Sequence, residues 1–129
     1  MKKLLLVNLI SLFYLSGCST ITGLIPSTWD DNQGRAIIDI RQSVIHSDCA
    51  ENLPAQLNTI NQQTEWFHLY SESKGTNDMD NLIGKFQLTL TEFKDRTTKE
   101  KVSPFYCDLK KKLMTTQVDA IAKTVLGRY

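Results

Sequence analysis

Histidine is scarce in this sequence, and the residue patterns of common active sites are missing from it. His46 and His68 are the only histidines among 129 residues, and neither has a cysteine or carboxylate at metal-ligand spacing on its own helix face. The chain has no glycine-rich phosphate loop, no nucleophile motif and no His-Glu zinc motif. We therefore expect a protein that is not an enzyme and that holds neither a metal nor another cofactor.

An excess of one charge is also missing. The whole chain has 15 Lys and Arg against 14 Asp and Glu, which gives a formal net charge of +1. This balance argues against a nucleic-acid partner and against an anionic membrane surface. The densest basic stretch is Lys110–Lys112, which we interpret as a solvated helix face, with a patch for an acidic partner as the alternative.

The sequence has a single long apolar run, and this run is too short to cross a membrane. It spans Leu4–Leu15, is interrupted by Asn8 and Ser11, and follows Lys2 and Lys3. A helix needs about 20 apolar residues to span a bilayer. A positive start, a short apolar segment and small residues after it are the layout of a cleaved secretory signal.

The signal ends in the tetrad Leu15–Cys18 (Leu-Ser-Gly-Cys), which resembles the bacterial lipobox. The resemblance implies a signal peptide over residues 1–17 and a lipid on the sulfur of Cys18, whose acyl chains would hold the processed protein on a membrane. The alternative is an ordinary signal peptide with an incidental cysteine. Under the sorting rule of enterobacterial lipoproteins, Ser19 in place of Asp implies delivery by the lipoprotein-sorting machinery to the periplasmic face of the outer membrane.

The processed chain would have 112 residues, the size of one domain, with thirteen bases against fourteen acids. Residues 18–26 read as a short lipidated tether without charge, and residues 27–129 as the domain. Fully extended, the eight residues from Ser19 to Pro26 reach at most about 28 Å. The domain is therefore expected close to the membrane.

Two cysteines remain after Cys18, namely Cys49 and Cys107. An even pair in an exported chain is expected to be oxidised, because the periplasm forms and keeps disulfides. A metal or redox pair is the alternative, but such pairs favour close spacing, and these two cysteines are far apart. We predict one structural disulfide between Cys49 and Cys107.

The periodicity of apolar residues predicts an all-α domain. The four expected helices cover residues 27–49, 54–70, 79–93 and 104–126, with Ser27 and Ser103 as N-caps of the first and last. Ser71–Asp78 and Asp95–Lys101 are expected to be loops. Residues 86–93 also alternate like a strand, but the helical period holds over a longer stretch.

The apolar stripes indicate which side chains face the core. For the first helix we expect Trp29 in this stripe, together with Ala36, Ile37, Ile40 and Val44. For the last helix we expect the main inward stripe to be Tyr106, Leu109, Leu113, Ala120 and Ile121, with Met114, Val118 and Val125 as a second stripe beside it.

Short connections between four helices favour an up-down-up-down bundle. In that topology the end of the first helix and the start of the fourth lie at the same end of the bundle. Cys49 and Cys107 occupy those two places, so they would lie within the separation of about 5–6 Å between Cα atoms that a disulfide requires. The topology and the predicted disulfide are therefore consistent with each other.

Some large apolar residues do not belong to the expected core stripes. They are Trp66, Leu69 and Tyr70 on the second helix and Leu88 on the third. One interpretation is irregular packing, in which these residues fill gaps. The other is a groove that accepts an amphipathic helix from a partner, since such recognition uses apolar anchors and favours aromatics.

A lipobox, four expected helices and a cysteine pair joining the first helix to the fourth resemble the type II secretion pilotins of the PulS/OutS type. Only Cys18, Cys49 and Cys107 carry the resemblance residue by residue. It implies an escort that binds the C-terminal segment of a secretin, which becomes helical on binding, and that directs the secretin to the outer membrane for assembly.

Two further interpretations stay open. A periplasmic inhibitor or immunity lipoprotein would block an enzyme or receptor with a projecting polar element, for which the Ser71–Asp78 loop is the candidate. A purely structural envelope lipoprotein is the third.

Overall fold

A computed structural model describes residues 29–128 of the chain. The expected signal peptide, the lipidated Cys18 and the tether over residues 18–26 lie outside the described residues. Within them, helices are the only regular elements, in the order α2 (Asp31–His46), α3 (Leu53–Ser73), a 3₁₀ helix η1 (Asn77–Met79), α4 (Asp80–Lys99) and α5 (Pro104–Leu126). The predicted all-α class with four helices is confirmed.

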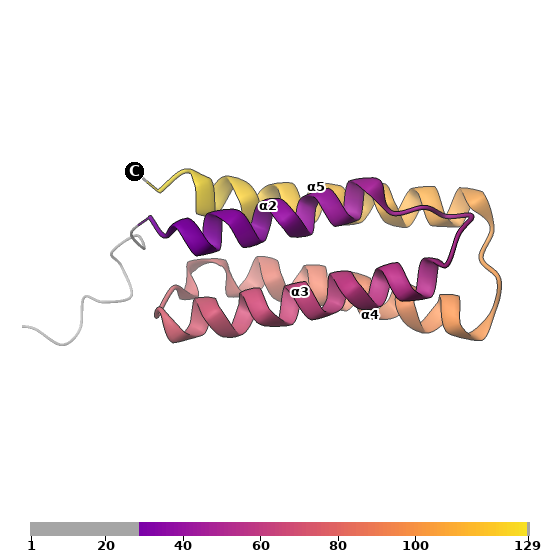
Figure 1. Cartoon of the computed structure of the whole chain (residues 1–129), viewed down its shortest axis with the longest axis horizontal. Coiled ribbons are helices and arrows are strands. Elements are labelled where there is room, and N and C mark those ends of the chain that lie inside the picture. Colours follow the sequence, from indigo (N-terminus) through magenta and orange to yellow (C-terminus); the bar gives the residue numbers. More distant parts are fainter. Residues whose placement is uncertain (1–28, 129) are drawn as a thin grey trace, which may run out of the picture.

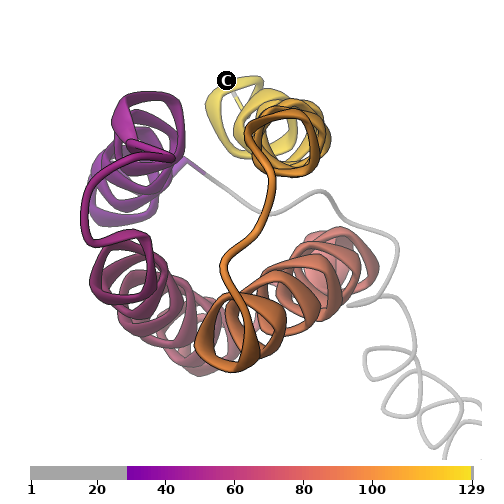
Figure 2. The ribbon, with the colours of Figure 1, turned by 90° about the vertical axis from the view of Figure 1, so that its right-hand side faces the viewer.

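The four helices form an antiparallel bundle in which consecutive helices run in opposite directions (Figure 1). The end view shows them around one axis, with α2 between α3 and α5, and α4 completing the ring (Figure 2). The side chains that fill the centre come from all four helices. The largest fully buried ones are Phe67, Phe86, Phe93, Ile37, Ile40, Leu57, Ile60, Met79, Ile83, Leu90, Met114 and Ile121.

A disulfide joins Cys49, in the α2–α3 connection, to Cys107, in the first turn of α5. Their Cα atoms are 6.0 Å apart, and Cys107 is fully buried. The predicted disulfide is confirmed. It lies at the end of the bundle opposite the start of α2, so it fixes the α2–α3 connection to the first turn of α5.

The predicted start of the first helix at Ser27 was wrong. The helix begins at Asp31, and Asp30 caps it, because its backbone is extended (φ −139°) and its carboxylate accepts the Gln33 N–H at 3.0 Å. Trp29 therefore precedes the helix and does not follow its periodicity. The Trp29 side chain is 42% exposed and lies over Gly34, so its predicted place in the core was also wrong.

The predicted C-terminal ends of the first three helices were also wrong. At each of them, serine or threonine hydroxyls donate hydrogen bonds to backbone carbonyls inside the helix or at its end. The first helix stops at His46 and not at Cys49, since Ser47 follows it and donates to the carbonyl of Val44 at 2.8 Å.

The second helix continues to Ser73, beyond the predicted end at Tyr70. Ser71 donates to the Phe67 carbonyl at 2.8 Å, so its hydroxyl needs no other partner inside the helix. Gly75 then adopts φ +68°, which allows the N–H of Thr76 to bond the carbonyl of Ser71 at 3.0 Å.

The third helix runs through to Lys99, across most of the predicted Asp95–Lys101 loop. Thr97 and Thr98 donate to carbonyls three residues earlier, at 2.8 and 2.9 Å. The last turn also carries Arg96 and Lys99, which the negative end of a helix favours.

The prediction for α5 was right for Ile121, which is 1% exposed, but wrong for Leu109 and Leu113. Leu109 and Leu113 are 53% and 44% exposed, whereas the stripe predicted to lie beside them forms the core. The buried residues of α5 are Cys107, Met114, Val118, Ile121, Ala122 and Val125. Since the disulfide fixes Cys107 toward the interior, the residues that share its helix face follow it there.

Candidate partner-binding surface

The histidines and carboxylates of the described chain do not gather into a metal site. Among residues 29–128, no group of three His, Cys, Asp or Glu side chains could hold a metal ion. His46 lies 3.0 Å from Gln42, and His68 lies 3.7 Å from Glu72, each on its own helix. Helices of the length and apolarity needed to cross a membrane are likewise absent from this part of the chain.

Trp66 and Tyr70 form one structured part of the surface, on the side of α3 that faces α2. Their rings stack with centroids 5.0 Å apart and planes 9° from parallel. The Tyr70 hydroxyl donates to Asp30 at 3.2 Å and accepts from the Asn32 amide at 3.0 Å. The stack therefore holds Trp66 in place although half of its side chain, 52%, is exposed.

A hollow of about 220 Å³ lies beside this stack, between α2 and α3. Its lining consists of Asn32, Arg35, Ala36, Asp39, Gln63 and Trp66. The indole is the large apolar surface in this lining, and amide and charged groups surround it. Such an arrangement suits an apolar side chain of a partner, with polar groups at the rim to orient it.

Leu69 and Leu88 are exposed apolar side chains on two neighbouring helices. Leu69 follows Trp66 by three residues on α3 and is 65% exposed. Leu88 is 74% exposed and lines a separate, open hollow on α4. The structure thus brings Trp66 and Tyr70 together, with Leu69 on the same helix, and places Leu88 in a different hollow.

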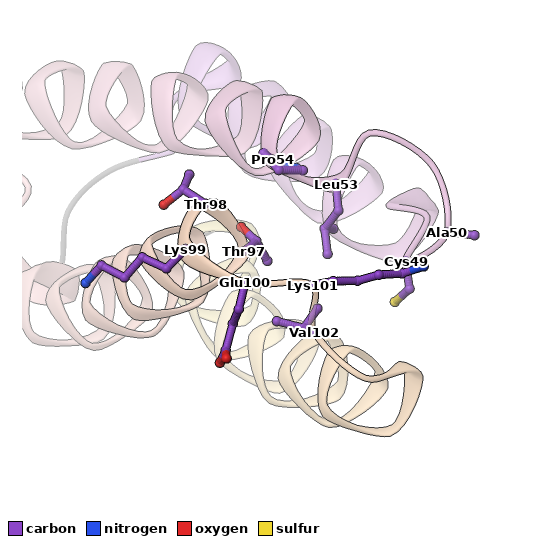
Figure 3. Close-up of a pocket in the computed structure, with 10 residues that line it drawn as sticks. All are labelled: Cys49, Ala50, Leu53, Pro54, Thr97, Thr98, Lys99, Glu100, Lys101 and Val102. Atoms are coloured by element: carbon purple, nitrogen blue, oxygen red, sulfur yellow. The ribbon is translucent and has the colours of Figure 1, made fainter.

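Another hollow, of about 440 Å³, lies at the disulfide end of the bundle (Figure 3). It is bounded by Leu53 and Pro54 at the start of α3 and by residues 97–102 at the end of α4 and after it. Its cysteine, Cys49, is oxidised in the disulfide and so supplies no thiol. The hollow therefore offers shape and charge but no free thiol.

An exposed apolar stripe on α5 was missed by the sequence analysis. Phe105, Leu109 and Leu113 follow one another at intervals of four residues and are 78%, 53% and 44% exposed. The spacing was visible in the sequence, but Leu109 and Leu113 were assigned to the core. The position of Cys107 was the signal that could have placed them outside.

The Ser71–Asp78 segment is not a projecting loop. Ser71 belongs to α3, and Thr76 is 6% exposed. The amide of Gln33 on α2 donates to Ser71 at 3.0 Å and to Thr76 at 2.6 Å. These bonds hold the segment against the bundle.

No protein-family model matches the chain, and no curated protein or solved structure is significantly similar to it. What this surface binds is therefore inferred from its own geometry and chemistry.

Proposed function

We propose that this protein is an outer-membrane lipoprotein that binds the C-terminal segment of a type II secretion secretin and directs it to the outer membrane. One observation carries the proposal: large apolar side chains lie outside a core that is already closed. Trp66, Leu69 and Leu88 are at least half exposed, while Phe67 and Leu90, close to them in sequence, are buried. Apolar side chains that packing does not require are typical of protein-binding surfaces.

The bundle also has the properties that an escort needs. The Cys49–Cys107 disulfide cross-links one end of it, and its long helix faces are surfaces along which an amphipathic helix can lie. A secretin segment that orders on binding would place apolar residues against the Trp66 side of α3. The ordering lowers its affinity relative to the area that it buries.

The alternative, a periplasmic inhibitor or immunity lipoprotein, would use the Ser71–Asp78 segment as its projecting element. The contacts of Thr76 and Ser71 with Gln33 hold that segment against the bundle. The escort is therefore the better supported of the two proposals.

The lipid anchor is tested by Cys18→Ser. Because this change removes the sulfur that carries the lipid, the protein is expected to move from the membrane fraction to the soluble periplasmic fraction. The secretin should then fail to reach the outer membrane. Fractionation with immunoblotting measures both, and a Cys18→Ser protein that still sediments with membranes would exclude the anchor.

The docking of the secretin segment is tested by Trp66→Ala, with Trp66→Phe as its matched control. We expect Trp66→Ala to weaken binding of the secretin C-terminal peptide at least tenfold, because it removes the exposed indole, without lowering the unfolding temperature. Trp66→Phe keeps a ring on Tyr70 and should retain most of the affinity. Calorimetric titration measures the affinity, and equal binding by all three proteins would contradict this placement.

A further inference from the structure

The exposed stripe Phe105, Leu109 and Leu113 is a second surface that packing does not explain. Its three side chains lie along two turns of α5, on the side away from the core. The opposite face of the same helix packs in the core through four side chains that are each no more than 1% exposed: Met114, Val118, Ile121 and Val125. Single exposed leucines are ordinary on protein surfaces, whereas three in register on one helix face form a set of anchors.

The surroundings of the stripe are basic. Residues 99–112 contain five lysines against Glu100 and Asp108, in a chain whose whole net charge is only +1. Lys110 pairs with Glu92 at 2.9 Å, and Lys111 donates to the Ser47 carbonyl at 2.5 Å. Lys112, next to Leu113, is exposed and forms no ion pair within residues 29–128. One edge of the stripe thus carries positive charge that the bundle itself does not neutralise.

We propose that the stripe formed by Phe105, Leu109 and Leu113 docks an amphipathic helix of another protein, with acidic residues beside its apolar face. The apolar residues of that helix pack between the three anchors, and its carboxylates face Lys112. The start of α5 adds to this preference, because the positive end of a helix dipole favours acidic groups. The proposal goes beyond the secretin escort: it needs no secretin and uses a different helix from Trp66.

Two other occupants fit less well. A second copy of this chain would set the same net-basic segment against itself, and like charges oppose association. An anionic lipid surface is the other, and the apolar face is too short for it. Beyond Leu113, this face of α5 continues with Thr116 and not with another large apolar residue. A helix that lies in a membrane interface needs a longer apolar face.

The experiment uses the purified full chain and three fluorescent 18-residue peptides. The first is a designed amphipathic helix with leucines on one face and glutamates beside them. The second has lysines in place of the glutamates, and the third has the composition of the first in scrambled order. Fluorescence anisotropy at low and at moderate salt gives the affinities.

We expect the glutamate peptide to bind wild type, and the other two to bind at least tenfold more weakly. Leu109→Ala and Phe105→Ser should each weaken binding at least fivefold without lowering the unfolding temperature, because both side chains lie outside the core. Lys112→Glu should lower the affinity for the glutamate peptide and raise the affinity for the lysine peptide. Ile38→Ala, which changes an exposed apolar residue on α2 outside both proposed surfaces, is the matched control and should bind as wild type does.

Four results would overturn the proposal. They are unchanged binding by Leu109→Ala, loss of binding by Trp66→Ala alone, a dimer that Leu109→Ala abolishes, and binding to phosphatidylglycerol vesicles that Leu109→Ala abolishes. None of them decides whether the secretin is escorted, since that is measured by its co-purification with wild type.

Discussion

Asp30 fixes the start of α2 through the bonds of its side chain. It accepts the Gln33 N–H at 3.0 Å and the Tyr70 hydroxyl at 3.2 Å, and Lys74 lies 3.9 Å away. Partial burial raises the pKa of this carboxyl, but the hydrogen bonds from the Gln33 backbone, Tyr70 and the Asn32 backbone outweigh it. The pKa of Asp30 therefore lies below its ordinary value. One residue thus caps α2 and holds the aromatic stack in place.

We expect Asp30→Ala to lower the free energy of unfolding by about 1 kcal/mol at pH 7, as the loss of an N-cap does. A carboxyl whose pKa is lowered by folding stabilises the protein above its ordinary pKa of about 3.9, and this contribution is lost as pH falls through the folded value. The difference between wild type and Asp30→Ala should therefore shrink in acid.

Urea unfolding at pH 7, 4 and 2.5 measures this difference. Asp30→Asn is the matched control, because asparagine also caps helices but does not titrate in this range. It should stay close to wild type at pH 7. A difference between wild type and Asp30→Ala that is the same at all three pH values would show that the charge contributes nothing.

At the scale of the helix, the sequence identifies which residues share a face but not which face a neighbour covers. On α3 only one long apolar stripe exists, and its members Leu53, Leu57, Ile60, Thr64 and Phe67 are all buried. On α5 two stripes compete, and the spacing alone does not choose between them. Cys107 does, because its disulfide requires it to face α2, yet this constraint was not applied to Leu109 and Leu113.

A buried polar network ties three elements at the end of the bundle opposite the disulfide. Gln33 on α2 is fully buried and donates to Ser71 and Thr76, while its carbonyl accepts from Arg128 at 2.8 Å. Arg128 is 7% exposed and also donates to Asp78 at 2.5 Å. The network therefore connects α2, the α3–η1 turn and Arg128, two residues after α5.

Gln33→Leu should destabilise the bundle although leucine is more apolar than glutamine. The change removes the acceptor of the Arg128 guanidinium and the donor to the Ser71 and Thr76 hydroxyls. An unsatisfied buried polar group costs about 1–3 kcal/mol. Chemical denaturation measures the loss. The control is Gln42→Leu on the same helix, whose side chain is exposed and contacts His46. If Gln33→Leu were as stable as Gln42→Leu, the network would not contribute to stability.

For the whole molecule, the fold was predictable because two independent observations gave the same topology. Short connections favour antiparallel neighbours, and the one expected cysteine pair requires the end of the first helix to lie beside the start of the fourth. The helix ends were not predictable to the residue, because they depend on where hydroxyls such as those of Ser47 and Ser71 find carbonyls. The candidate surface was predictable only in part. Trp66 and Leu88 lie outside every core stripe, but whether such residues share a hollow depends on helix rotation, which periodicity does not specify.

The disulfide acts on the molecule as a whole, since it closes a loop of 58 residues that contains α3 and α4. In the chain-entropy model, a loop of this length stabilises the folded state by about 4 kcal/mol, because the bond restricts the unfolded chain. The double variant Cys49→Ser/Cys107→Ser should lose about this amount in guanidinium unfolding. Wild type treated with a reductant should lose a similar amount, and Leu88→Ala should lose none. If the double variant were as stable as wild type, packing and the Arg41–Asp119 ion pair at 2.5 Å would be enough to hold α2 and α5 together.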